Sequence, residues 1–276
     1  MNTETARFLN ELNKRFYDVC ASSFSDTRSA AWPGWKKCFD AIDSACRDGD
    51  AIRILDVACG NMRFESFLQN EMGKDRFAIC AVDTCESLAR EGSETFGLPV
   101  RFADDVELPL SAESLDTGEM LFNQRDIVSC VLADEPFGFS GFDIAACFGF
   151  FHHVPGAKAR AALLDQLCDA VNPGGVIVIS LWRFLDDERL ACKASKTTEL
   201  VRIDLAKALD FEALEQGDAF LGWQERSGVY RYAHSFSDEE VEALIGGISS
   251  RTELISRFRS DGRTGDLNEY LVLSKL

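Results

Sequence analysis

The chain has 276 residues, 46% of them hydrophobic, and a formal net charge of −17 at pH 7. This length can bury a sizeable core, in one large domain or in two small ones. So negative a field repels nucleic acid unless a local basic face overrides it, which excludes a generally basic nucleic-acid-binding surface. We interpret the acidic surface first as an aid to solubility.

The cysteines and the N-terminal residues indicate the compartment. No two of the ten cysteines have C-x-x-C spacing, and Cys59, Cys80 and Cys147 sit in or beside apolar runs typical of strands. We interpret them as buried reduced thiols and expect neither disulfides nor a metal site. Residues 1–5 lack the basic start and apolar stretch of a signal peptide, and no run approaches transmembrane length. We therefore expect a cytoplasmic protein without a membrane partner.

Residues 1–48 are expected to form an N-terminal helical cap. Residues 5–20 carry apolar side chains at helical spacing, and Pro33 suits the first turn of a helix over 33–46. Residues 24–28 are expected to form the loop between them. The sequence leaves two roles open for this segment: a packing layer of aromatic rings, or a lid over a ligand. The lid would be formed by Tyr17, Arg28 and Trp35.

A strand, a tight turn and a helix are predicted next. Residues 53–57 form an apolar, β-branched-rich run that suits a strand buried on both faces. Small residues with a single glycine, Gly60, follow, and a helical pattern begins at Arg63 and ends near Gly73, a suitable C-terminal cap. This arrangement brings backbone N–H groups close to a ligand at the carboxyl end of a strand.

The second buried strand, 77–83, ends in an acid. Asp83 is placed to accept hydrogen bonds from both ribose hydroxyls of a nucleoside. A helix is expected near 87–94, and a third strand around 120–128, although 100–102 could also form a short strand. The segment 106–119 is expected to be a surface insertion. An acid just past the third strand could receive an adenine amino group, and the candidates are Asp126 first, then Asp104 or Asp105.

Strand and helix alternate again in the second half of the chain. Residues 142–148 predict the fourth strand, 157–171 a helix with one apolar stripe, and 176–182 the fifth strand. Between the fourth strand and that helix lie His152 and His153. Repeated strand–helix alternation indicates an α/β fold with a doubly wound, parallel sheet.

The C-terminal third is expected to complete the sheet. Residues 183–228 are charged and helical, and we interpret them as a substrate-side insertion that covers the active cleft. Residues 230–236 alternate like a strand, and Ser237 begins a helix with a capping-box-like pattern. The runs 254–258 and 270–273 flank a turn and predict a hairpin that closes the sheet edge.

Together these features resemble class I S-adenosylmethionine-dependent methyltransferases. Residues 54–61 resemble their first motif, Asp83 their ribose acid, and 142–155 with 172–176 their later motifs. The resemblance runs from about residue 50 to the C-terminus. It implies a seven-stranded Rossmann-like methyltransferase sheet over 49–276, mostly parallel with an antiparallel C-terminal hairpin. It also implies S-adenosyl-L-methionine as cofactor and S-adenosyl-L-homocysteine as product.

A narrower resemblance involves both ends of the chain. Five segments resemble the eukaryotic methyltransferases that esterify 5-carboxymethyluridine at the tRNA wobble position, and bacterial relatives of unassigned substrate. These segments are 16–33 in part, 151–153, 180–182 and 230–236, with the Gly60-Asn61 pair of the first motif. Met62 departs from that family, which has glycine there. The sequence has no dense Lys/Arg run for tRNA phosphates, so the resemblance implies the cofactor more firmly than the acceptor.

The resemblance assigns roles to individual residues. The implied cofactor-binding residues are Tyr17, Arg28, Asp56, Ala58, Cys59, Gly60, Asn61, Asp83, Thr84, Asp126, Ile127, Phe148 and Gly149. Ala58–Asn61 would approach the methionyl part through backbone groups, and Asp56 would orient that loop or receive the ammonium. Asp126 and Ile127 would bind the adenine. Phe148 and Gly149 would line the other side of the methionine.

His152, His153 and Arg231 are the candidate catalytic residues. A neutral histidine could remove a proton from a hydroxyl or amine acceptor. A carboxylate acceptor needs no base, and an arginine could clamp it with two hydrogen bonds. The candidate clamps are Arg183, Arg231 and Arg28. The histidine pair could equally be a hydrogen-bonded loop, and His234 is expected to be structural.

The sequence supports three functions. We expect a methyltransferase that acts on an O or N acceptor in a small molecule, for which an acidic surface is no obstacle. The first alternative is methylation of the tRNA wobble uridine. The second is a cofactor-binding subunit without turnover that supports a partner protein, to which Met62 would be a clue.

Overall fold

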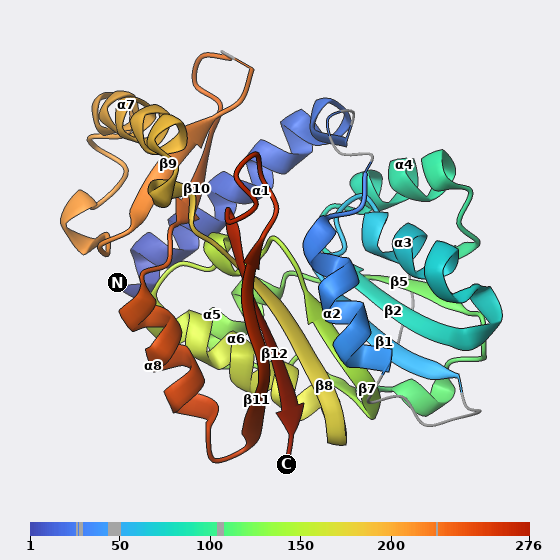
Figure 1. Ribbon diagram of the computed structural model, residues 1–276. Helices are drawn as coiled ribbons and strands as arrows, with labels where there is room; N and C mark the ends of the chain where they lie inside the picture. The colour runs from blue at the N-terminus through green and yellow to red at the C-terminus, as the bar shows by residue number, and fades with distance from the viewer. Residues whose placement is uncertain (26, 28–29, 44–50, 104–107, 225) are drawn as a thin grey trace.

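The structure is a computed structural model that describes residues 1–25, 27, 30–43, 51–103, 108–224 and 226–276. Its centre is an eight-stranded sheet in the order β11-β12-β8-β7-β1-β2-β5-β3 (Figure 1). The strands are β1 (Ile52–Val57), β2 (Phe77–Asp83), β3 (Val100–Phe102), β5 (Met120–Gln124), β7 (Phe142–Cys147), β8 (Val171–Trp182), β11 (Thr252–Ser260) and β12 (Asn268–Lys275). Neighbours pair in parallel, except that β12 pairs antiparallel with both β8 and β11.

The predicted fold class is therefore confirmed, with one strand more than the seven expected. The additional strand is β3, the short strand that the sequence left open. It pairs with β5 from Val100 to Phe102 and forms one edge of the sheet. The predicted C-terminal hairpin forms the opposite edge.

Helices cover both faces of the sheet, which gives it two cores (Figure 1). The helices are α1 (Thr3–Ser25), α2 (Pro33–Asp43), α3 (Arg63–Met72), α4 (Glu86–Phe96), α5 (Ile127–Ala133), α6 (Ala157–Ala170), α7 (Glu188–Asp204) and α8 (Asp238–Ile248). Helices α2, α3 and α4 bury Trp35, Phe64 and Ala89 against one face. Helices α5, α6 and α8 pack on the other face. Strands enclosed on both sides must be apolar throughout, as β2 is until its last residue.

Two local expectations were wrong. Helix α1 continues through Ser25, so the predicted loop at 24–28 begins later. The described part of the predicted surface insertion, 108–119, contributes buried side chains, Leu110, Ala112 and Leu115, to the α5–α6–α8 core. Its short strand β4 (Leu110–Ser111) pairs with β6 (Phe139–Ser140). Asp104 and Asp105 lie outside the described residues.

The segment after β8 builds a separate small unit beside α1. Helix α7 packs on β9 (Asp218–Gly222), which pairs antiparallel with β10 (Tyr230–His234), and β10 contacts α1 (Figure 1). The expected strand is thus confirmed, but all five residues of β10 are buried because the strand is covered on both sides. The division into a cap at 1–48, a main domain and an insertion at 183–228 remains a prediction.

The described cysteines and helices add two further facts. Nine cysteines are free thiols, and eight of these are buried, whereas Cys192 on α7 is exposed. Among the helices that the structure describes, none combines the length and apolar character needed to cross a bilayer.

Candidate active site

A cleft of about 460 Å³ opens at the carboxyl ends of the central strands, under α1. This volume is typical of small-molecule sites. Apart from the candidate clamp Arg183, its lining includes the predicted site residues that the structure describes: Tyr17, Asp56, Ala58, Cys59, Gly60, Asn61, Asp83, Thr84, Asp126, Ile127, Phe148, Gly149, His152, His153 and Arg231. Arg28 lies outside the described residues. Trp35, the third residue of the predicted lid, also lines the cleft. The roles assigned to these residues remain predictions.

The loop after β1 has an unusual backbone. Ala58, Gly60 and Met62 all have positive φ, at 66°, 56° and 58°. A side chain at Gly60 would meet only Leu88 within 4 Å, at 3.9 Å, so the space above this glycine is open. Met62 carries the strain of a left-handed residue with a side chain, in a position where glycine is unstrained. Its side chain is fully buried in the α2–α3–α4 core and stays out of the cleft.

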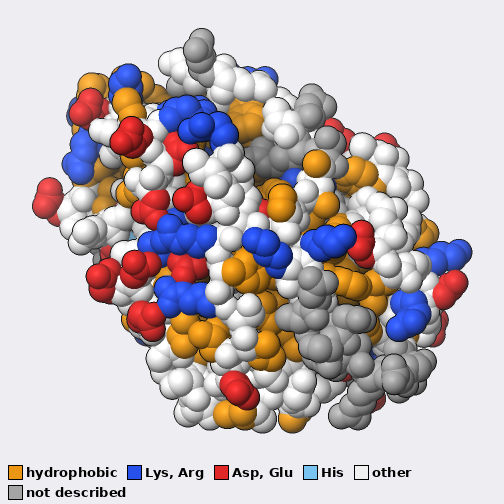
Figure 2. Space-filling model, viewed as in Figure 1, with side chains coloured by type: hydrophobic (Ala, Val, Ile, Leu, Met, Phe, Trp, Pro, Cys, Tyr) orange, Lys and Arg blue, Asp and Glu red, His pale blue; other side chains and the backbone are white. Residues whose placement is uncertain are grey.

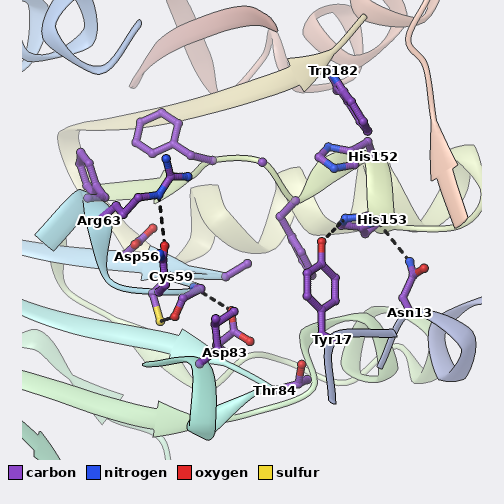
Figure 3. A pocket seen from close by; sticks show the side chains of 18 of the residues that line it. Asn13, Tyr17, Asp56, Cys59, Arg63, Asp83, Thr84, His152, His153 and Trp182 are labelled. Carbon is purple, nitrogen blue, oxygen red and sulfur yellow. Dashed lines mark hydrogen bonds between the residues drawn. The ribbon is translucent and has the colours of Figure 1, made fainter. Parts of the chain in front are cut away.

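Asp83 holds this loop from the end of β2. One carboxylate oxygen accepts the Gly60 N–H at 2.9 Å, and the other accepts the Cys85 N–H at 2.9 Å. Burial raises the pKa of Asp83, and the backbone hydrogen bonds oppose that rise. The residue lines the cleft (Figure 3). Its contact with ribose remains a prediction.

Two further acids, Asp56 and Glu65, lie close together beneath the loop. Asp56 is 2% exposed and Glu65, on α3, is fully buried. Burial and then the neighbouring Glu65 raise the pKa of Asp56 well above its ordinary value, and burial raises the pKa of Glu65 to about 7. Two desolvated carboxyl groups in contact cannot both ionise cheaply, so the pair holds a proton near neutral pH.

Asp126 is committed to structural contacts. It caps α5 by accepting the Ser129 N–H at 2.9 Å, and it accepts from Asn10 at 3.1 Å and from Lys14 at 3.2 Å, both on α1. Burial alone would raise the pKa of this carboxyl group, but these donors outweigh it and lower the pKa. The contacts fasten α1 over the cleft. The predicted contact of Asp126 and Ile127 with adenine remains a prediction.

The two histidines lie at the other end of the cleft (Figure 3). His153 Nδ1 lies 2.9 Å from the Tyr232 carbonyl, and its Nε2 lies 2.8 Å from the Tyr17 hydroxyl. The Asn13 side-chain nitrogen also lies 3.2 Å from Nδ1, so this ring nitrogen faces both an acceptor and a donor. Both ring nitrogens of His153 therefore have polar partners. This agrees with the second interpretation of the histidine pair, a hydrogen-bonded loop, rather than with a catalytic base. The His152 ring lies 4.8 Å from the Trp182 ring.

Arg231 of β10 lies beside these rings with little polar support. It is 7% exposed, and its guanidinium lies 5.3 to 5.7 Å from the rings of Phe16, Phe24 and Trp182. Its Nη1 donates to the Tyr17 hydroxyl at 3.3 Å, and its Nε has no hydrogen-bond partner among the described residues. A buried guanidinium in this state gains from an anion brought into the cleft.

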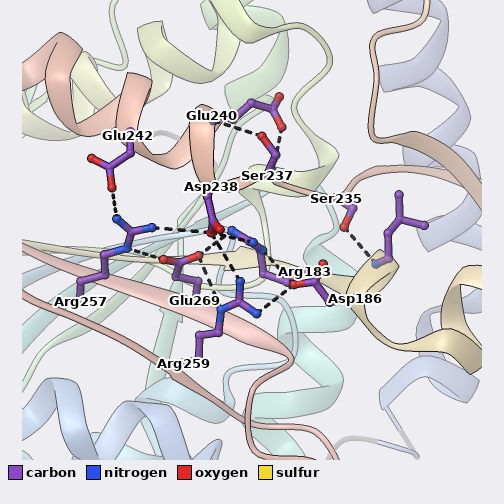
Figure 4. Close-up of polar contacts among 11 residues, drawn as sticks. Arg183, Asp186, Ser235, Ser237, Asp238, Glu240, Glu242, Arg257, Arg259 and Glu269 are labelled. Carbon is purple, nitrogen blue, oxygen red and sulfur yellow. Dashed lines mark hydrogen bonds and ion pairs between the residues drawn. The ribbon is translucent and has the colours of Figure 1, made fainter.

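The other candidate clamp and the third histidine serve the fold. Arg183 forms ion pairs with Glu269, Asp238 and Asp186, away from the cleft lining (Figure 4). His234, expected to be structural, is fully buried and lies between two carboxylates: its Nδ1 is 2.7 Å from Asp218 and its Nε2 is 2.8 Å from Glu240.

Some residues that line the cleft received no role from the sequence, among them Asn13, Arg63, Arg125 and Trp182. Asn13 had a signal, since it is a polar residue within the apolar stripe of the first helix. Its Oδ1 accepts the Tyr232 N–H at 2.7 Å and so ties α1 to β10. Trp182 also had a signal in the sequence, because it ends a buried strand at the edge of the sheet where ligands bind.

Comparisons with known proteins agree with this geometry. A family model described as "Methyltransferase domain" matches residues 25–223. A tRNA (carboxymethyluridine(34)-5-O)-methyltransferase of Arabidopsis thaliana is 27% identical over 168 residues, which cover 61% of this chain but only 32% of that protein.

Solved structures share the fold at low sequence identity. A SAM-dependent methyltransferase from Methanosarcina mazei has a TM-score of 0.58 at 16% identity, with 86% of this chain and 97% of that chain covered. An S-adenosylmethionine-dependent methyltransferase from Clostridium acetobutylicum has a TM-score of 0.52 at 10% identity, with 95% and 98% covered. The family model matches most of the chain, so the protein belongs to the methyltransferase domain family, and it shares its fold with S-adenosylmethionine-dependent methyltransferases.

Proposed function

We propose that this protein methylates a carboxylate oxygen of a small-molecule acceptor. The observation that carries the proposal is Arg231, a buried guanidinium at the acceptor end of the cleft whose Nε lacks a hydrogen-bond partner among the described residues. An acceptor carboxylate would supply both the missing hydrogen bonds and the counter-charge. The Tyr17 hydroxyl, 3.3 Å from Arg231 and 2.8 Å from His153, would hold the guanidinium in place beside the acceptor.

The cofactor end fits S-adenosylmethionine. The space above Gly60 is open, backbone groups of Ala58–Asn61 face the cleft, and the Asp83 carboxylate can accept from ribose hydroxyls. Thr84, Asp126 and Ile127 would border the adenine, with Phe148 and Gly149 across the methionyl part. When bound, the cofactor supplies a methyl carbon activated by a sulfonium, and the protein aligns the acceptor with it.

A carboxylate acceptor simplifies the chemistry required of the side chains. Its oxygen forms a bond to the methyl carbon while the carbon–sulfur bond breaks and the electron pair stays on sulfur. No proton is removed, so His152 and His153 need not act as bases. Arg231 would orient the carboxylate, and the aromatic rings around it would exclude water. A hydroxyl or amine acceptor would instead require a neutral His152 as base.

Methylation of a tRNA wobble uridine is the second candidate, favoured by the Arabidopsis relative. The net charge of −17 opposes it. In Figure 2, the Lys and Arg side chains of the visible face are interspersed with Asp and Glu. We propose the small molecule first for this reason. Binding of tRNA, if it occurs, should weaken steeply between low and physiological salt.

The third function, a cofactor-binding subunit without turnover, is no longer supported by Met62. Met62 was the departure that suggested it, and the Met62 side chain lies in the core beneath the loop. Family membership and an open space above Gly60 both favour an enzyme.

The test is a transfer assay with S-adenosylmethionine labelled in its methyl group. Metabolite extract, total tRNA and total protein are offered separately. We expect label in the metabolite pool, released as methanol by mild base because the product is a methyl ester. Label that survives base would contradict the carboxylate. Label confined to tRNA would replace the first candidate by the second.

A further inference from the structure

Arg63 is a cation of the cleft that sequence reasoning gave no role. It is the first residue of α3 and lies immediately after the cofactor loop. Its guanidinium lies 5.2 Å from the Trp32 ring and 5.4 Å from the Trp35 ring. In Figure 3 it projects into the cleft above Asp56, on the far side from Tyr17 and Asp83. The two tryptophan rings hold the guanidinium at the end of the cleft that is formed by the loop Ala58–Asn61.

The hydrogen bonds of Arg63 all go to neutral oxygens. Its Nε donates to the Asn61 side-chain carbonyl at 3.1 Å, and its Nη1 donates to the Ala30 carbonyl at 3.0 Å. Burial lowers the pKa of Arg63 to about 10. Tyr270 and Asp261 nearby partly oppose this by favouring the charged form. A half-buried guanidinium whose hydrogen bonds go to neutral oxygens is a site for an anion.

S-adenosylmethionine contains one anion, the carboxylate of its methionyl group. The loop Ala58–Asn61 is the proposed seat of that group, and Arg63 follows it by two residues. Asp56, which also lines the cleft, offers a carboxyl group for the ammonium of that methionyl group. We propose that Arg63 receives the carboxylate of the cofactor's methionyl group and thereby selects ligands that carry it.

This inference rests on the cofactor of the family and on nothing about the acceptor. It gives different tasks to two cations of the cleft. Arg63 would serve the cofactor, whereas Arg231, which comes from β10 and contacts Tyr17, would serve the acceptor. The two tasks predict different ligand dependence for the two variants.

The experiment is calorimetric titration of Arg63→Gln with two ligands, S-adenosylmethionine and its decarboxylated analogue. The natural protein should prefer the first ligand by about 10- to 100-fold, the scale of a charge-assisted pair. Arg63→Gln should lose that preference through weaker binding of S-adenosylmethionine, with the analogue bound within about twofold of its natural affinity. Arg63→Lys, which keeps the charge without the planar fork, should retain part of the preference.

Arg90→Gln is the matched control. Arg90 also lies over an aromatic ring, Phe102 at 4.1 Å, and pairs with the acid Glu86, but on the outside of α4. It should leave both affinities unchanged. Equal loss of both ligands in Arg63→Gln, with a lowered melting temperature, would show that Arg63 only supports the fold and would overturn the proposal. So would unchanged binding of both ligands. A natural protein that binds neither ligand would overturn the cofactor assignment itself.

Discussion

The two ends of the cleft are built in different ways. Most of the proposed cofactor end comes from one continuous stretch, from β1 to the residue after β2, and later segments add Asp126, Ile127, Phe148 and Gly149. The acceptor end is assembled from four distant segments that supply Tyr17, His153, Trp182 and Arg231. The hydrogen bond between Arg231 and Tyr17 joins residues 214 positions apart. Local geometry therefore sets one end, and long-range packing sets the other.

The largest effect is expected from Gly92→Ala, a variant that should disrupt the cofactor end of the cleft and leave the acceptor end intact. A side chain at Gly92 of α4 would lie 2.1 Å from the Asn61 carbonyl oxygen, so backbone must move. We expect Gly92→Ala to cost about 3 kcal/mol of stability and to abolish detectable S-adenosylmethionine binding, because the loop is displaced. Thermal unfolding and calorimetry measure the two effects.

Gly247→Ala is the control for that variant. Gly247 lies in α8, and a side chain there would meet nothing within 4 Å. The helix should gain up to about 1 kcal/mol from the better helix former, with cofactor affinity unchanged. Normal cofactor binding by Gly92→Ala would show that the loop tolerates displacement, and would contradict the rigid cofactor end.

Asp83→Ala should weaken cofactor binding by about 1–3 kcal/mol. The ribose hydroxyls would lose a charged acceptor, and the Gly60 and Cys85 N–H groups would lose their partner. Titration with S-adenosylmethionine measures the change, and Glu94→Ala, an exposed acid of α4, serves as control. An unchanged affinity would place the ribose elsewhere in the cleft.

His234→Gln tests the support of the acceptor end. Burial lowers the pKa of His234, but the hydrogen bonds to Asp218 and Glu240 outweigh it and raise the pKa above 6.5. The stabilisation by the imidazolium is thus complete below pH 6.5 and is lost as pH rises through the higher pKa of the folded state. We expect the variant to cost about 2 kcal/mol at pH 6 and less at pH 9.

Unfolding of both proteins in urea across this pH range checks the slope. The natural protein should lose stability towards high pH relative to the variant, while the affinity for S-adenosylmethionine stays equal. Identical pH dependence of the two proteins would mean that His234 is neutral in the folded state.

Arg231→Gln is expected to have the smallest effect of these variants. It should lower methyl transfer to the acceptor without changing cofactor affinity. Label transfer into the metabolite pool at limiting extract should fall about tenfold, since a neutral amide cannot supply the counter-charge. Cofactor affinity should remain within about twofold, because Arg231 lies at the acceptor end. Arg231→Lys should keep part of the rate. A parallel loss of cofactor binding would show that the ends are coupled through Tyr17.

The strand, turn and helix around Gly60 could be predicted because their signals are local. A buried strand, a turn of small residues and an acid at the end of the next strand predicted the positions of Gly60 and Asp83. The sequence did not indicate Arg63, since a basic residue at a helix start is common and only the Trp32 and Trp35 rings place it in the cleft. The buried contribution of 108–119 was also missed, because short two-residue strands leave no periodic pattern.

The sequence by itself determined the α/β alternation, the antiparallel final hairpin and the cofactor loop. Each depends on residues within about one strand–helix unit, where periodicity and turn chemistry act. Only the tertiary structure decided that Arg183 is paired while Arg231 faces the cleft, that Asp126 fastens α1, and that His153 is held by Tyr17. Such choices depend on which distant groups share a desolvated space, and burial and pairing there arise only when the chain has packed.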